Sequence, residues 1–146
     1  MSFVRQTTFL LKSLYQVRPI QCSQVFLRKM SVEKTLFEKI ASKEIPSTIV
    51  YEDDKCVAFR DINPVAPVHI VLVPRVCGNL SQLRYATADQ KEDLGHLLYT
   101  AKEIALKEGL EDGYRIVIND GEIAGQTVFH LHIHIIGGKK LGWPPC

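Results

Sequence analysis

The stretch VFHLHIHIIGG, residues 128–138, alternates between two kinds of side chain and predicts a β-strand. Successive side chains of a strand point to opposite faces of the sheet. One face of this strand therefore carries three imidazoles, spaced about 6.6–6.8 Å apart along the strand; they belong to His130, His132 and His134. The other face is apolar, and we expect it to pack against a helix; it consists of Phe129, Leu131, Ile133 and Ile135.

Four further strands are predicted where β-branched and aromatic residues concentrate between turn residues. They are STIVYED (47–53), KCVAFRDINP (55–64), HIVLVP (69–74) and GYRIVIN (113–119). A short helix is predicted within residues 32–46, and a long helix from the capping box Thr87–Gln90 to Gly109. Short links between strands favour hairpins, so we expect an α+β fold with an antiparallel five-stranded meander sheet, one long helix and one short helix.

Charge divides the chain into an N-terminal extension, residues 1–32, and a domain, residues 33–146. The extension holds five basic residues and no acidic residue; because the whole chain of 146 residues carries +2, the domain carries −3. No clustered basic face suggests a nucleic-acid partner. No segment approaches the ~20 apolar residues of a membrane span, so we expect no membrane partner either.

The N-terminal extension has the pattern of a mitochondrial transit peptide. On a helical wheel its apolar residues Phe3, Leu10, Leu14 and Val17 share one face, with Arg5, Lys12 and Gln16 opposite. Acid-free, amphipathic, Arg-bearing segments of this kind direct proteins to mitochondria. The alternative is a disordered tail without a targeting role, which leaves the protein cytoplasmic or nuclear.

The four cysteines, Cys22, Cys56, Cys77 and Cys146, form no CxxC pair. Their spacing indicates neither a zinc site nor a disulfide framework, so reduced thiols without chemistry are expected.

Three interpretations of the histidine face are open. Histidines that merely fill space are disfavoured, because each buried ring needs hydrogen-bond partners for two nitrogens. A metal site is possible, since two histidines two positions apart on a strand can share one ion, with His69 as a distant further ligand. The third interpretation is nucleophilic attack on phosphorus by a neutral imidazole. The preceding loop favours this chemistry, because Gly125 permits close backbone approach and the Thr127 hydroxyl can help to hold a phosphate.

The motif His130-Leu131-His132-Ile133-His134-Ile135-Ile136 resembles the histidine triad that names the HIT superfamily. The similarity extends through residues 34–146, including GYRIVINDG, GQTVFHLHIHIIGG and the closing WPP, and it is greatest to the Hint branch of histidine triad nucleotide-binding proteins.

This resemblance implies a purine nucleoside phosphoramidase that splits the P–N bond of adenosine 5′-monophosphoramidates through a nucleotidyl-histidine intermediate. It implies His132 as the nucleophile, flanked by His130 and His134, with His69 as a further active-site histidine. It also implies that the Asp61 carboxylate holds the ribose hydroxyls, with Ile62 beside it. The remaining implied roles are a base pocket of Phe37, Ile45 and Phe59, and phosphate contacts from Asn119, Gly125, Gln126 and Thr127.

The resemblance further implies a homodimer, paired through the long helix and a strand, and chemistry that needs neither a metal nor a cofactor. Two departures stand out: Thr127 occupies a position where the family often has serine, and residues 75–82 (RVCGNLSQ) carry a small insertion. They affect the expected side-chain and leaving-group preference, not the core chemistry.

Two other functions stay open on the sequence alone. One is a nucleotide-binding adaptor whose dimer surfaces carry the biological role, with incidental turnover. The other is a metal-dependent hydrolase that uses the histidine face. From the residues alone, Asp61 can also be a turn cap, and Phe37 and Phe59 can be plain core.

Overall fold

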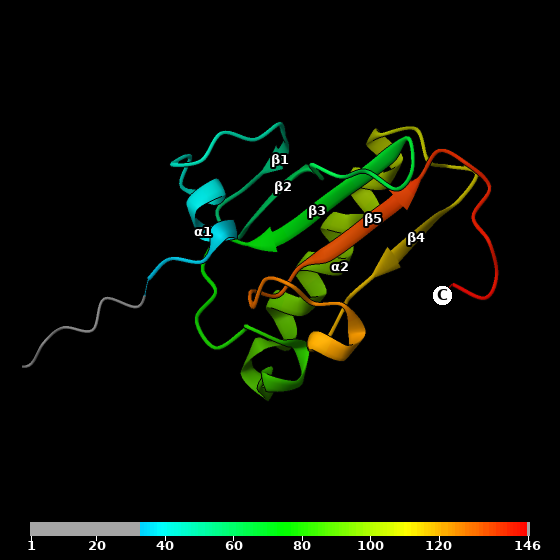
Figure 1. Cartoon of the computed structure of the whole chain (residues 1–146). Coiled ribbons are helices and arrows are strands. Elements are labelled where there is room, and N and C mark those ends of the chain that lie inside the picture. The colour runs from blue at the N-terminus through cyan, green and yellow to red at the C-terminus, as the bar shows by residue number, and fades with distance from the viewer. Residues whose placement is uncertain (1–32, 146) are drawn as a thin grey trace, which may run out of the picture. The chain divides into compact units, whose positions relative to one another are not determined.

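Five strands form one antiparallel sheet in the computed structural model of this chain, which describes residues 33–145. Figure 1 shows the long helix α2 running along one face of that sheet. The strands are β1 (Ile49–Glu52), β2 (Cys56–Arg60), β3 (Val68–Pro74), β4 (Tyr114–Val117) and β5 (Ile133–Gly137). The helices are α1 (Leu36–Ala41) and α2 (Lys91–Lys107). The expected α+β fold, with one long and one short helix, is confirmed.

The order of the strands is β1-β2-β3-β5-β4. The first three strands follow one another as a meander, as expected. Helix α2 then carries the chain across the sheet to β4, and β5 returns to lie between β3 and β4 (Figure 1). This order departs from a simple meander because β5 pairs on both of its edges, which places the histidine-bearing strand inside the sheet.

Alternation along the strands divides the interior into two clusters. The cluster on the α2 side holds the expected apolar side chains Leu131, Ile133 and Ile135, which pack with α2 residues such as Ile104. The opposite side of the sheet carries the second cluster, which includes Phe37 from α1 and Phe59 from β2. Phe129, in contrast, is half-exposed and belongs to neither cluster.

Strand β5 is shorter than the predicted strand over residues 128–138, because the neighbouring β3 ends at Pro74. Beyond that point the loop after β3 binds the chain instead: the Leu131 N–H donates to the Leu80 carbonyl at 2.7 Å. His130 and His132 therefore lie outside the strand, and the predicted ladder of three evenly spaced imidazoles is wrong in this detail. The rings of His132 and His134 remain close, with centroids 5.0 Å apart.

Both helices begin at capping boxes. The predicted box Thr87–Gln90 is confirmed, and a short 3₁₀ turn leads from it into α2. A second box joins Thr35 and Glu38 at the start of α1. None of the helices within residues 33–145 is long and apolar enough to cross a bilayer. The predicted transit peptide lies outside the described residues, and its interpretation stays a prediction.

Candidate functional site

The histidines lie on the sheet face opposite α2. His69 comes from β3, His134 from β5 and His132 from the residue before β5. The antiparallel register pairs His69 with Ile136 and Val71 with His134, so His69 and His134 are diagonal neighbours across adjacent strands. Side chains in such positions on one face are within reach of each other.

The bonding of His132 leaves one ring nitrogen free for chemistry. Its Nδ1 lies 2.8 Å from the carbonyl oxygen of His130, and a carbonyl only accepts, so Nδ1 carries the proton and donates it. Nε2 then holds a lone pair and has no hydrogen-bond partner among the described residues. The edge-on Phe37 ring, 5.1 Å away between centroids, restricts the orientation of this buried imidazole. A neutral imidazole with a free, fixed Nε2 is a nucleophile ready for attack.

His69 and His134 form a directed chain of hydrogen bonds. The Val65 N–H donates to Nδ1 of His69 at 3.3 Å, which leaves the His69 proton on Nε2. That Nε2 lies 2.9 Å from Nδ1 of His134 and donates to it. The proton of a neutral His134 is thereby assigned to its Nε2. His134 thus offers a donor beside the nucleophile, where His132 offers a lone pair.

Burial sets the charge state of His134. Desolvation, and then the charges of His132 and His69, lower the pKa of His134 from 6.5 to about 4, against the opposing carboxylate of Asp61. Burial likewise lowers the pKa of His130. Both rings are therefore neutral at pH 7 in the free protein, which is the form that the hydrogen-bond chain requires.

His130 has no exposed surface and both of its ring nitrogens are occupied. Nε2 donates to the Pro74 carbonyl at 2.8 Å, and Nδ1 accepts from the Thr35 hydroxyl at 2.7 Å. The expected catalytic role of its side chain is thus not supported by this geometry, because no ring nitrogen is left for a substrate. His130 instead positions His132 through its backbone carbonyl.

Asp61 lies beside the histidine pair at the end of β2. Its Oδ2 is 3.5 Å from Nε2 of His69 and 3.9 Å from Nδ1 of His134. Its Oδ1 accepts the N–H of Asn63 at 2.8 Å, which is the turn-cap contact considered from the sequence. The carboxylate is largely buried, and the neighbouring Ile62 is 91% exposed.

The loop before the histidines is held by the side chain expected to contact phosphate. Gln126 is 2% exposed, accepts the Gly121 N–H at 2.9 Å and donates to the carbonyls of Ser81 and Val128. Both N–H groups of this amide are thus engaged within the protein, and the expected phosphate contact of Gln126 stays a prediction. Gly125 adopts φ = 87°, a conformation that favours glycine, and Thr127 is exposed. An added Cβ at Gly125 would lie 4.0 Å from the Asn119 amide, so these two residues face each other across the loop.

The three apolar residues expected around a base come together in the cluster beside His132. Phe37 and Phe59 lie 5.6 Å apart between ring centroids, and the partly exposed Ile45 packs against the same cluster. Phe37 also contacts His132. The apolar wall and the nucleophile are thus adjacent.

Two groups of described side chains have the spacing of metal ligands. One is Asp61, His69 and His134, within the histidine face, and the other is Asp53, Cys56 and His96, on the α2 side of the sheet. The first group includes the distant ligand His69 that the metal interpretation required. In this structure Nε2 of His69 and Nδ1 of His134 form a hydrogen bond with each other.

Sequence reasoning missed two residues that hold the site. Thr35 caps α1 and also bonds His130, and Glu38 accepts the Thr35 and Cys77 N–H groups at 2.9 and 3.0 Å. The Thr35-to-Glu38 spacing is itself a capping-box signal, whereas the link to His130, 95 residues away, is visible only in the fold.

The HIT domain family model matches residues 42–141. The maize "14 kDa zinc-binding protein" is 55% identical over 119 residues, which cover 82% of this chain and 93% of the relative. "Adenylylsulfatase HINT1" of Arabidopsis thaliana is 57% identical over 111 residues, 76% of each chain. The crystal structure of a HIT family hydrolase from Legionella pneumophila matches with a TM-score of 0.74 and 43% identity, covering 77% of this chain and all of that one.

These similarities, together with the arrangement of the histidines, define a histidine triad protein. The chain belongs to the HIT family, and its relatives support its place in the Hint branch. The expected family is therefore confirmed.

Proposed function

We propose that this HIT-family hydrolase acts as a nucleoside phosphoramidase, which cleaves the P–N bond of adenosine 5′-monophosphoramidates. The observation that carries the proposal is the pair of opposite tautomers: Nε2 of His132 holds a lone pair, and Nε2 of His134 holds a proton. Attack on phosphorus and departure of an amine need these two groups side by side.

In the first step Nε2 of His132 attacks phosphorus and forms an N–P bond. The P–N bond to the leaving group breaks, and its electron pair stays on the amine nitrogen. That nitrogen takes the Nε2 proton from His134 in its protonated form, in which Nδ1 also carries a proton and no longer accepts from His69. Negative charge from the bound phosphoryl group and from Asp61, 3.9 Å from Nδ1 of His134, favours this protonated form.

In the second step water attacks the phosphorus of the nucleotidyl-His132. Donation of the Nε2 proton in the first step leaves His134 neutral with its remaining proton on Nδ1, on the side of Asp61. Its Nε2 lone pair takes the water proton, and the electron pair of the N–P bond returns to His132. AMP and the original protonation states result. The Nδ1 hydrogen bond of His132 to the His130 carbonyl stabilises the positive charge that the ring carries while it is nucleotidylated.

The purine is assigned to the apolar wall of Phe37, Ile45 and Phe59, and the ribose to Asp61. Phosphate oxygens are assigned to Asn119, Thr127 and the backbone at Gly125, because Gln126 is committed to holding the loop. Binding of this kind uses an apolar surface for the base and a few convergent polar groups for the rest.

We also propose a homodimer. The outer surface of α2 exposes Leu98, Tyr99 and Leu106, and Trp143 in the C-terminal tail is 87% exposed. Large apolar residues exposed on a helix and on the C-terminal tail suit a partner surface. Sedimentation of the wild type and of Leu98→Glu tests this assembly; a wild-type monomer at micromolar concentration contradicts it.

Residues 1–32 are proposed as a mitochondrial targeting segment on the strength of their charge pattern alone. A fusion of this segment to a fluorescent reporter should accumulate in mitochondria. A diffuse cytosolic signal contradicts the targeting role and supports the untargeted tail.

Adenylyl sulfate hydrolysis is a second candidate, because a relative that is 57% identical is named an adenylylsulfatase. The same attack on phosphorus would release sulfate instead of an amine. The name of the maize relative points to zinc, and Asp61, His69 and His134 are spaced to hold it. No step above requires the ion, so turnover should survive EDTA; loss on chelation with recovery on zinc would support the metal-dependent alternative.

The direct experiment compares kcat/KM for AMP-lysine and adenylyl sulfate, together with capture of the intermediate. Wild-type protein quenched in alkali during turnover should carry a nucleotidyl group on His132, detected by mass spectrometry of its peptides. Preference for AMP-lysine supports the phosphoramidase. Absence of turnover of both substrates, with nucleotide still bound, favours the adaptor function.

A further inference from the structure

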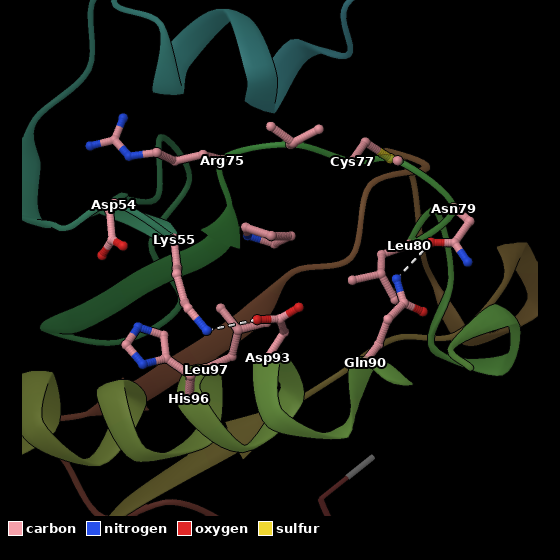
Figure 2. Close-up of a pocket in the computed structure, with 13 residues that line it drawn as sticks. Asp54, Lys55, Arg75, Cys77, Asn79, Leu80, Gln90, Asp93, His96 and Leu97 are labelled. Atoms are coloured by element: carbon pink, nitrogen blue, oxygen red, sulfur yellow. Dashed lines mark hydrogen bonds and ion pairs between the residues drawn. The ribbon is translucent and has the colours of Figure 1, made fainter. Parts of the chain in front are cut away.

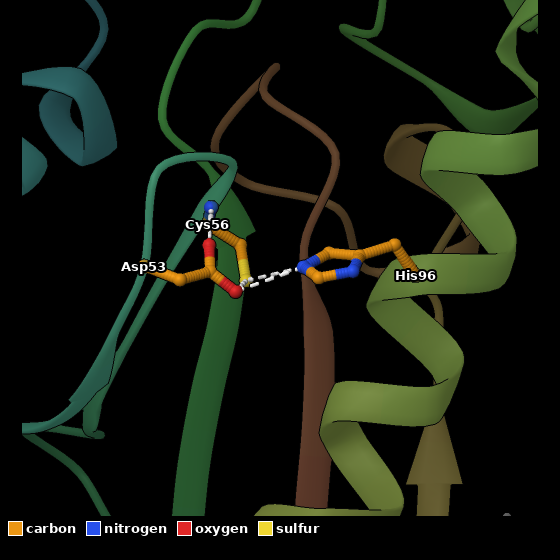
Figure 3. A group of neighbouring side chains, drawn as sticks. All are labelled: Asp53, Cys56 and His96. Carbon is orange, nitrogen blue, oxygen red and sulfur yellow. Dashed lines mark hydrogen bonds and ion pairs between the residues drawn. The ribbon is translucent and has the colours of Figure 1, made fainter.

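A second histidine outside the triad is held close to a thiol and a carboxylate on the α2 side of the sheet. His96 lies on α2, while Asp53 and Cys56 lie at the β1–β2 hairpin; Figure 3 shows the three side chains converging. His96 Nε2 is 2.8 Å from Asp53 Oδ2 and 3.8 Å from Cys56 Sγ, and that Sγ is 3.4 Å from the same Oδ2. Three atoms of three different donor types thus form one small triangle.

The size of this triangle matches one face of a tetrahedral zinc site. Zinc binds sulfur at about 2.3 Å and nitrogen or oxygen at about 2.0–2.2 Å, so three ligand atoms of one ion lie on a circle of radius about 2.0 Å. The circle through Oδ2, Sγ and Nε2 with the separations above also has a radius of about 2.0 Å. One ion can therefore contact all three atoms without movement of the backbone.

The contacts around the triangle hold the ligands in place. Asp53 Oδ1 accepts the N–H groups of Lys55 and Cys56 at 2.8 and 2.7 Å, which leaves Oδ2 directed at the other two ligands. The Tyr51 hydroxyl donates to Oδ2 at 2.9 Å. Hydrogen bonds of this outer kind orient the ligands of protein metal sites.

The arrangement does not suit the sulfur to act as a nucleophile. In a thiol–imidazole–carboxylate triad the carboxylate holds one ring nitrogen while the other takes the proton of the thiol. Here Asp53 and Cys56 both approach Nε2 of His96. Cys56 also has no exposed surface, so a substrate cannot reach its sulfur.

Solvent reaches His96, one of the three residues of the triangle. His96 lines a cavity of about 280 Å³ beneath the loop after β3, and its side chain is one-third exposed. Figure 2 shows His96 and Asp93 on α2 at this cavity, with Lys55 reaching toward Asp93. Because His96 borders this cavity, we expect water to reach a fourth ligand position from the side of His96.

From this convergence we propose that Asp53, Cys56 and His96 bind one zinc ion, with water as the fourth ligand. The donor set selects a borderline-soft transition metal over Mg²⁺ and Ca²⁺, which prefer oxygen ligands. Binding replaces the thiol proton, which passes to solvent. The ion links the β1–β2 hairpin to α2 and stabilises the folded chain by mass action. The site shares no residue with the histidine face and does not depend on the proposed catalytic function.

Cobalt provides the test, because a thiolate ligand produces a sulfur-to-cobalt charge-transfer absorption that imidazole and carboxylate ligands do not. Reduced full-length protein titrated with Co²⁺ should show this band, saturating at one equivalent and disappearing when Zn²⁺ is added. A variant with the other three cysteines replaced by serine (Cys22, Cys77 and Cys146) should keep it. His134→Gln, which alters the other group of potential ligands, should also keep it.

Three substitutions remove one ligand each, and two of them preserve the local packing. Asp53→Asn retains the oxygen that the backbone N–H groups need, and His96→Gln changes a partly exposed side chain; Cys56→Ser changes a buried one. Loss of a residue that only hydrogen-bonds a metal ligand lowers metal affinity by about 10–100-fold. Loss of a ligand itself should therefore lower zinc affinity by at least about a hundredfold. His96→Gln should leave phosphoramidate turnover unchanged and should abolish the rise in Tm that zinc causes.

Circular dichroism of the metal-free variants establishes that they fold. An absent charge-transfer band in the wild type overturns the proposal. A band that survives in both Cys56→Ser and His96→Gln assigns the ion to another site and also overturns it.

Discussion

Histidines lie on both faces of the same sheet: the triad with His69 on one face, and His96 on the α2 face. The hydrogen bonds of the two regions differ in form. On the histidine face a hydrogen-bond partner holds one nitrogen of a ring and fixes the state of the other, so donors and acceptors alternate from Val65 through His69 to His134. On the α2 face Asp53 and Cys56 both approach the same nitrogen of His96.

A chain of alternating donors and acceptors transmits a tautomeric preference and places a proton at a chosen atom. The arrangement of Asp53, Cys56 and His96 does not transmit such a preference, but it concentrates metal-ligating atoms around one point. The same residue type is thus suited to proton transfer in one region and to cation binding in the other, and the partners of the two ring nitrogens decide which.

The largest expected contrast is between His132→Ala and His96→Gln. Loss of the nucleophile should lower kcat for AMP-lysine about ten-thousandfold, because no other group forms the covalent intermediate. His96→Gln should stay within about twofold of the wild type, since His96 lies on the α2 side of the sheet, away from the histidine face. AMP affinity, measured by calorimetry, should survive in both. Residual activity above a tenth of the wild type in His132→Ala would assign the attack to another residue.

A change at His134 tests whether the hydrogen-bond chain delivers a proton. His134→Gln should lower kcat/KM for AMP-lysine by about 10²–10⁴-fold, the range for loss of general acid catalysis. Adenylyl sulfate should lose less than about tenfold, because sulfate leaves as the anion of a strong acid and needs no proton. Equal losses on the two substrates would restrict His134 to a structural or binding role.

Acid should destabilise the histidine face. The folded protein holds the pKa of His134 at about 4 instead of 6.5, so the unfolded chain binds more protons between these values. Stability that is fully present above pH 6.5 is therefore lost as the pH falls toward 4, by about 3 kcal/mol from this side chain. His130, whose pKa burial also lowers, adds to the same trend.

Urea unfolding at pH 7 and pH 4.5 measures this loss. His134→Gln should reduce the difference in the free energy of unfolding between the two pH values, whereas Tyr99→Phe, an exposed change on α2, should retain it. If His134→Gln showed the same difference in the free energy of unfolding as the wild type, the burial of His134 as a neutral ring would be contradicted.

A comparison of two substrates, with and without ribose hydroxyls, tests the role of Asp61. If its carboxylate accepts the ribose hydroxyls, Asp61→Ala should lower kcat/KM for ribonucleotides about tenfold to a hundredfold more than for 2′,3′-dideoxy analogues, because charge-assisted hydrogen bonds contribute about 1.5–3 kcal/mol each. The wild type should distinguish the two sugars and the variant should not. Equal losses would assign Asp61 to the turn with Asn63 and to the histidine pair.

The smallest effect concerns the loop before the triad. Gln126→Ala leaves the Gly121 N–H and two carbonyls without their partners and should lower the free energy of unfolding by about 1–3 kcal/mol. Gln126→Glu keeps the acceptor for Gly121 but removes the two donated bonds, so denaturant titration of both variants separates these contributions. An unchanged midpoint in Gln126→Ala, with a raised KM, would restore direct phosphate binding to this residue.

Local sequence patterns determined much of this protein. Period-two alternation placed Leu131, Ile133 and Ile135 in the core beneath α2, and the Thr87–Gln90 spacing marked the start of that helix. These features depend on neighbours a few positions apart, which the sequence displays directly. The triad motif and the matching segments around it also indicated the family, because the identity of the residues was enough.

Tertiary structure alone decided which polar groups meet and which nitrogen each imidazole uses. The end of β3 at Pro74 shortened β5 and directed His130 to Thr35 and a backbone carbonyl. The packing of α2 on the β1–β2 hairpin brought His96 to Cys56, 40 residues away. Hydrogen-bond direction and ligand geometry act over distances of about 3 Å, and only the folded chain brings residues so far apart in sequence within that range.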